Sequence, residues 1–263
     1  MILRPLDPPK PRNGGVIAAW DAVARTQQSA ATRYALIRQP DHARLSGELA
    51  RHLALPVSPA ISDEIVQGIS LHDEGWAPFD SGCEKLHATG AQYSGAGVAM
   101  NAEGKPLSFQ DIKPEDFLRA WRESIAAAEQ VAPIAALIVS GHFRRLGKTG
   151  VEARRYSSAE TELVREFLRE EEARRERLCR LERRAPAEIE YWTDMLQFCD
   201  LLSLYLCCGA MENVEFPQRV ASEGETIRLR RESGTILLCP ALMAGETEFT
   251  TRAQVFPLEM RSR

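Results

Sequence analysis

The stretch SPAISDEIVQGISLHDEGWAP, residues 58–78, decides how the rest of the sequence is interpreted. Its isoleucines recur at four-residue spacing and predict an amphipathic helix that Ser58-Pro59 begins and Gly75 ends. His72 and Asp73 stand at the end of this helix. Adjacent residues on a helix point about 100° apart, so both can bind one ion only where the helix ends or bends. Gly75 supplies that bend, and the pair is therefore a candidate ligand site.

Apolar periodicity and helix-starting prolines indicate further helices. We expect them at residues 41–54, 114–131, 134–146, 158–184 and 187–208. The helix at 134–146 is apolar almost all round, which is typical of a buried helix. The one at 158–184 is densely charged and is interpreted as a solvated surface helix. Residues 147–157 are basic, contain glycine and are interpreted as a loop.

Strand character is confined to the two ends of the sequence. The N-terminal strand is expected at 33–39 and the C-terminal ones at 226–231, 235–239 and 247–256, with a turn at Glu232-Ser233-Gly234. Residues 1–15 are expected to be an extended or irregular lead-in. The fold class is therefore mainly α, with a helical domain over residues 1–210. Residues 211–263 form a small antiparallel β segment packed on the same domain, which strand 33–39 could join.

The composition is that of an ordinary globular protein. The 263 residues carry a formal net charge of −4, with 27% charged and 44% hydrophobic residues, enough for a substantial core. The mildly acidic balance argues against a nucleic-acid partner, since phosphate binding needs a basic surface. We find neither an apolar run of the roughly 18–20 residues that span a membrane nor a secretory signal. Six cysteines without CxxC spacing favour buried thiols in a reducing, cytoplasmic environment.

Histidines are few in this sequence. They are His42, His52, His72, His87 and His142. Asp200 lies inside the apolar run Phe198-Cys199-Asp200-Leu201-Leu202. A carboxylate there is costly unless it is paired, hydrogen-bonded or bound to metal, which makes Asp200 the most informative acid in the sequence. His52 is offset from the leucine stripe of its helix and is interpreted as a surface residue.

Four short motifs follow one another in an informative order. They are Gln39-Pro40-Asp41-His42, Leu71-His72-Asp73-Glu74-Gly75, Ser140-Gly141-His142 and Cys199-Asp200. This order resembles the HD superfamily of metal-dependent phosphohydrolases over residues 37–205. The amino-acid sequence at His72–Trp76 and Asp200–Leu204 is similar to that of an uncharacterised bacterial branch of this superfamily, whose function is not established. The resemblance implies an HD-domain-like helical bundle.

Carried over by position, the resemblance implies that His42, His72, Asp73 and Asp200 bind a divalent metal ion. Two imidazoles and two carboxylates suit Mn, Fe, Ni, Co or Mg better than a closed structural zinc site, and the identity of the ion stays open. The ion would activate water for hydrolysis, and Asp73 would orient that water or take its proton. His142 is a second catalytic candidate, as a further ligand, a substrate contact or a general acid.

The sequence departs from the catalytic members at one place. Some of them carry a lysine shortly after the doublet that can touch phosphate, whereas this sequence reads Glu74-Gly75-Trp76-Ala77-Pro78. The nearest replacements are Arg144, Arg145 and Lys148, just after His142. These three residues are candidate substrate-binding residues, and a basic helix end favoured by the helix dipole is the alternative interpretation.

Three functions fit these features. The first is a metal-dependent hydrolase of a small phosphorylated compound, such as a nucleotide, phosphomonoester or phosphodiester. The second is a non-catalytic HD-like ligand-binding or scaffold protein, which predicts a homo-oligomer built through the C-terminal sheet or the charged helix. The third is an HD-type oxygenase using iron and O₂, whose usual ligand set is one residue short here unless His87 joins.

Each ligand also has a purely structural interpretation. His42 could make a local hydrogen bond at its helix start, and His72 could simply pair with Asp73. His142 could be a satisfied core histidine. Asp200 could bond a buried backbone group or an arginine.

Overall fold

The computed structural model describes residues 1–7, 15–54, 61–221, 225–232, 235–243 and 247–256. Its helices are α1 (Ala19–Gln27), α2 (Gln39–His52), α3 (Asp63–Leu71), α4 (Ala77–Asp80), α5 (Pro114–Glu129), α6 (Pro133–Glu152), α7 (Ser158–Cys179) and α8 (Pro186–Cys208), with 3-10 turns η1 (Glu74–Trp76) and η2 (Phe109–Asp111). The expected mainly helical fold class is confirmed. No described helix is both long and apolar enough to cross a membrane.

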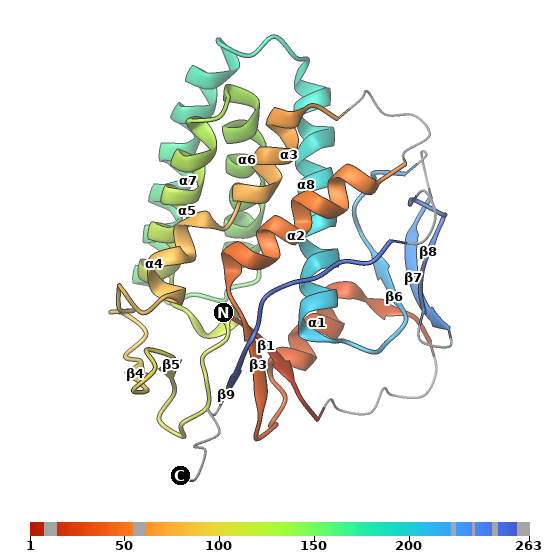
Figure 1. Ribbon diagram of the computed structural model, residues 1–263. Coiled ribbons are helices and arrows are strands. Elements are labelled where there is room, and N and C mark those ends of the chain that lie inside the picture. Colours follow the sequence, from red (N-terminus) through yellow and green to blue (C-terminus); the bar gives the residue numbers. More distant parts are fainter. Residues whose placement is uncertain (8–14, 55–60, 222–224, 233–234, 244–246, 257–263) are drawn as a thin grey trace.

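Helix α6 occupies the middle of the bundle and packs against α3, α5, α7 and α8 (Figure 1). Every residue from Ile134 to Phe143 is buried, as the all-round apolar pattern predicts. Proline stands in the first turn of α2, α5, α6 and α8, where its missing N–H costs no hydrogen bond. Helix α7 begins instead with a capping box between Ser157 and Glu160.

Two glycines allow close contacts between neighbouring helices that a larger residue would block. A Cβ added at Gly75 would fall on the carbonyl oxygen of Ala120 in α5. One added at Gly141 would lie 2.9 Å from Oγ1 of Thr193 in α8. The backbone of Gly75 does not have positive φ, so this glycine is required by contact rather than by a turn.

The strands form two sheets that each join N-terminal to C-terminal segments. The strands are β1 (Ile2–Pro5), β2 (Ile17–Ala18), β3 (Tyr34–Ile37), β6 (Val214–Phe216), β7 (Ile227–Glu232), β8 (Thr235–Cys239) and β9 (Gln254–Phe256), besides a short pair β4 (Gln92–Tyr93) and β5 (Ala99–Met100). One sheet has the order β1-β3-β9 and the other β2-β6-β7-β8. Strand β2 pairs with β6 in parallel, and the other pairs are antiparallel.

Several sequence expectations need correction here. Only residues 153–157 of the expected 147–157 loop connect two helices, because α6 continues to Glu152 and α7 begins at Ser158. The glycines of this segment serve packing: Gly147 lies against Val164 and Leu168 of α7. The lead-in contains a buried strand, β1, and α1 follows where the sequence predicted no helix.

The single expected C-terminal sheet is two sheets, because β9 pairs with β3 while β7 and β8 pair with β6. The expected helix start at Ser58-Pro59 and part of the expected turn, residues 233–234, lie outside the described residues. All six cysteines are free, and the buried-thiol expectation holds only for Cys199, Cys207 and Cys208. Cys83, Cys179 and Cys239 are exposed.

Candidate metal centre

The His-Asp doublet lies where α3 gives way to η1. His72 follows the last residue of α3 with helical backbone angles, φ −58° and ψ −24°. Asp73 precedes η1 and leaves the helical region, with φ −119° and ψ 20°. This change of backbone direction turns the two adjacent side chains toward a common point, as the sequence predicted.

His42 approaches the doublet from the first turn of α2. Its side chain is fully buried, and its Nε2 lies 2.8 Å from Oδ2 of Asp73. The ring of His72 is 5.1 Å from that of His42, centroid to centroid. One ligand atom each from His42, His72 and Asp73 lie within 4.8 Å of one another, a separation that one ion can bridge.

A second group forms on the other side of His72. Asp200 of α8 places Oδ1 3.4 Å from Nε2 of His72 and Oδ2 3.8 Å from Nε2 of His142. Ligand atoms of His72, His142 and Asp200 again lie within 4.8 Å of one another. Asp200 also lies 3.9 Å from Nδ1 of His42, so five side chains form one continuous cluster in which His72 is common to both groups.

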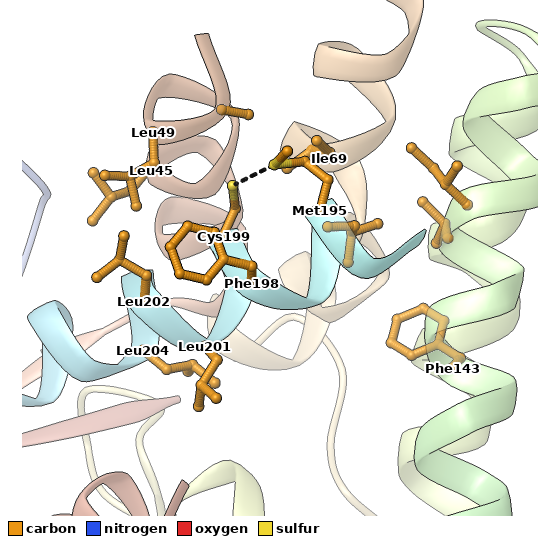
Figure 2. Packing of buried hydrophobic residues seen from close by; sticks show 14 of the residues in the cluster. Leu45, Leu49, Ile69, Phe143, Met195, Phe198, Cys199, Leu201, Leu202 and Leu204 are labelled. Atoms are coloured by element: carbon orange, nitrogen blue, oxygen red, sulfur yellow. Dashed lines mark hydrogen bonds between the residues drawn. The ribbon is translucent and has the colours of Figure 1, made fainter. Parts of the chain in front are cut away.

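The polar cluster lies beside a part of α8 whose other side chains are apolar and buried. Figure 2 shows apolar side chains of α8, among them Phe198, Leu201 and Leu202, pointing away from the helix axis amid residues of neighbouring helices. Leu45 and Leu49 of α2, Ile69 of α3 and Phe143 of α6 belong to the same buried cluster. Asp200 lies in this apolar sequence, and its side chain is 15% exposed, against 9% or less for the other four. The carboxylate of Asp200 thus has the most contact with solvent in the cluster.

A backbone carbonyl of α3 fixes the orientation of the His72 ring. Its Nδ1 lies 2.7 Å from the carbonyl oxygen of Ile69, which can only accept, so Nδ1 carries a hydrogen. The buried Nε2 has no hydrogen-bond partner among the described residues and lies between the carboxylates of Asp73 and Asp200. A buried nitrogen without a partner is costly, and a bound cation would remove that cost.

Charges within the cluster raise the pKa of His72 and lower that of Asp200. Burial opposes the charged form of His72, but Asp73 and Asp200 outweigh burial and raise the pKa of His72 to about 9. Burial likewise opposes the Asp200 carboxylate, yet its 3.4 Å ion pair with His72, together with the other two histidines, lowers the pKa of Asp200 to about 2. His72 and Asp200 thus stabilise each other's charged form, and residues with such strongly shifted pKa values are candidates for a functional site.

His142 differs from the other two histidines. Burial lowers the pKa of His142 to about 4, with the charges of His72 and His42 adding to the effect of burial. Its Nδ1 has no hydrogen-bond partner among the described residues. A neutral imidazole suits a metal ligand, and so low a pKa makes His142 a poor general acid or base near neutral pH.

The structure does not bring the predicted phosphate contacts into the cluster. Arg144 pairs with Glu172 of α7. Arg145 donates to Asp194 of α8 at 2.6 Å and to Glu190 at 2.7 Å. Lys148 is exposed on α6, about 1.7 turns beyond His142. The arginines therefore tie α6 to α7 and α8, because those helices present carboxylates that the sequence could not place next to them.

Two remaining histidines lie outside the cluster. His87 is exposed, and only its backbone N–H is fixed, by the carboxylate of Asp116. His52 is also exposed, which confirms that it is a surface residue. Its ring centroid lies 5.5 Å from that of Phe249. The extra histidine that an oxygenase would need is therefore not supplied by either.

Two serines that the sequence did not single out lie next to His42. Oγ of Ser203 lies 2.9 Å from Nδ1 of His42, and Oγ of Ser46 lies 2.8 Å from that of Ser203. Both side chains are fully buried. Ser46 is four residues after His42 and Ser203 three after Asp200, so each shares a helix face with a predicted ligand. That spacing is the signal that could have identified them.

Together, the fold and this cluster define a mainly helical protein with buried His and Asp groups that could hold a metal ion. The chain belongs to the family described as Protein of unknown function (DUF3891), whose family model matches residues 26–258. This range includes all five residues of the cluster. No curated protein and no solved structure matches the chain.

Proposed function

We propose that this protein is an HD-type metal-dependent hydrolase of a small phosphorylated compound, such as a nucleotide, phosphomonoester or phosphodiester. One observation carries the proposal. Two buried groups of ligating side chains share His72, whose Nε2 lacks a hydrogen-bond partner and lies between two carboxylates. Placing carboxylates and imidazoles together in a buried cluster is costly, and a bound cation would offset that cost.

His42, His72, Asp73 and Asp200 would hold the ion, with His142 within reach through Asp200. Imidazole and carboxylate donors together suit Mn, Fe, Ni, Co or Mg. A bound divalent ion lowers the pKa of water toward neutrality and polarises phosphoryl oxygens. Cleavage of a phosphate ester by activated water is the chemistry that this donor set supports best.

The protein's own residues would divide the remaining work. Asp73, 9% exposed and hydrogen-bonded to His42, would orient the attacking water or take its proton. His142, whose lowered pKa keeps it neutral, would serve as a further ligand or contact the substrate. The apolar residues around α8 would limit the access of other water, which strengthens every charge interaction in the site.

Elemental analysis of protein purified without chelator tests the metal, and a phosphatase screen with several divalent ions tests the chemistry. We expect about one or two ions per chain and metal-dependent phosphate release. His42→Gln should lose both, whereas His52→Gln, the same change on the exposed end of the same helix, should keep both. Asp73→Ala should abolish phosphate release.

The other outcomes identify the alternatives. Iron after aerobic purification, with O₂ consumption and no phosphate release, would indicate an HD-type oxygenase. A wild-type protein that takes up no metal under any of the conditions would indicate a ligand-binding or scaffold protein. Either result would overturn the hydrolase proposal.

A further inference from the structure

Ser203 lies directly behind the metal centre and makes three polar contacts. It is fully buried on α8, one turn after Asp200. Its Oγ lies 2.9 Å from Nδ1 of His42, 2.8 Å from Oγ of Ser46 and 2.8 Å from the carbonyl oxygen of Asp200. All three distances are those of hydrogen bonds.

Ser203 and Asp73 contact opposite sides of the His42 ring. A hydroxyl donates one hydrogen and accepts at two lone pairs, so Ser203 can pair with Nδ1 of His42 whether or not this nitrogen carries a hydrogen. On the other side of the ring, Nε2 lies 2.8 Å from a carboxylate oxygen of Asp73, which can only accept. Ser46 donates instead to the carbonyl oxygen of His42, at 3.1 Å. The ring is therefore held at both nitrogens, by Ser203 at Nδ1 and by Asp73 at Nε2.

From this pattern we infer that Ser203 is a positioning residue that holds the His42 ring through Nδ1 and so keeps Nε2 facing the metal ion. The inference rests on the metal centre of the proposed function. In the cluster, Nε2 is the His42 atom that faces Asp73, 2.8 Å away. Histidine ligands generally donate their second N–H to a fixed acceptor, which sets the tautomer and the ring orientation.

A backbone group has the same positioning role at His72, where the carbonyl oxygen of Ile69 lies 2.7 Å from Nδ1. A backbone carbonyl cannot be removed by substitution, whereas Ser203 can. Ser46 is an internal comparison, because it is equally buried and touches Ser203 but makes no side-chain contact with the His42 ring. Its removal leaves the bond between Nδ1 and Ser203 intact.

The test uses Mn²⁺ as the ion and ring-nitrogen NMR as the structural readout. In histidine labelled with ¹⁵N, the His42 signals are assigned as those absent from His42→Gln. In metal-free protein, Ser203→Ala should change the ring-nitrogen shifts of His42, whereas Ser46→Ala should leave them close to those of wild type. By calorimetry, Ser203→Ala should bind Mn²⁺ about 10- to 100-fold more weakly than wild type. Ser46→Ala should stay within about threefold of wild type, and Ser203→Thr, which keeps the hydroxyl, should regain most of the affinity.

Two results would overturn the inference. One is a set of His42 ring-nitrogen signals that Ser203→Ala leaves unchanged, in protein whose other histidine signals match those of wild type. The other is equal weakening of Mn²⁺ binding by Ser203→Ala and Ser46→Ala, which would indicate a general packing role. Neither readout involves phosphate, so wild type that binds Mn²⁺ but hydrolyses nothing refutes the hydrolase and leaves the role of Ser203 standing.

Discussion

Replacing Gly75 by alanine perturbs the support of the His-Asp doublet without touching a ligand. The new methyl would fall on the carbonyl oxygen of Ala120 and lie 2.9 Å from both the carbonyl carbon of Ala120 and Cβ of Glu123. Two of these three atoms are backbone atoms of α5, which cannot rotate away. The strain should therefore cost at least about 2 kcal/mol of unfolding free energy, in the range of overpacked cores. For a chain of this size that lowers the thermal midpoint by roughly 4–8 °C.

Thermal unfolding followed by circular dichroism in the presence of chelator measures this cost. Gly95→Ala is the matched control, because a Cβ there meets nothing within 4 Å and the backbone does not require glycine. Displacement of η1 should also move Asp73, two residues away, so Gly75→Ala should bind Mn²⁺ more weakly, while Gly95→Ala should not. A Gly75→Ala midpoint within about 1 °C of the control would refute the close-packing argument.

Three further outcomes follow from the charges of the site. In metal-free protein the raised pKa of His72 contributes stability that is complete below its ordinary value of 6.5 and is lost as pH rises through about 9. The thermal midpoint of wild type should therefore fall more between pH 7 and pH 9.5 than that of Asp200→Asn, which lacks one of the responsible carboxylates; an equal fall would contradict this assignment. Because the same proton must leave before metal binds, Mn²⁺ affinity by calorimetry should rise about tenfold per pH unit from pH 6.5 toward 9, and a flat profile would exclude His72 as a ligand. Arg145→Gln should lower the unfolding free energy by no more than about 1 kcal/mol and leave KM for any phosphate substrate unchanged, since its half-buried guanidinium is held by Asp194 and Glu190; a raised KM would place it in the substrate site.

Residue types and spacing determined a good part of this protein in advance. A carboxylate in the apolar run around Asp200 and a His-Asp doublet at a helix end are costly unless they serve each other or an ion, and the structure brings them together with His42 and His142. The fully buried α6 follows in the same way from local hydrophobicity. These features are readable because each depends on the chemistry of its own segment.

Pairing between distant segments was decided only by the tertiary structure. Strand β9 pairs with β3 rather than with the β7–β8 hairpin, although all four segments have similar strand character. Arg145 meets carboxylates of α8, and Ser203 meets His42 across 161 positions of sequence. A hydrogen bond depends on where its partner lies and in which direction it points, and neither is encoded in the residues next to it. The residues of the cluster could therefore be predicted from the sequence, whereas the hydroxyl that contacts the His42 ring could not.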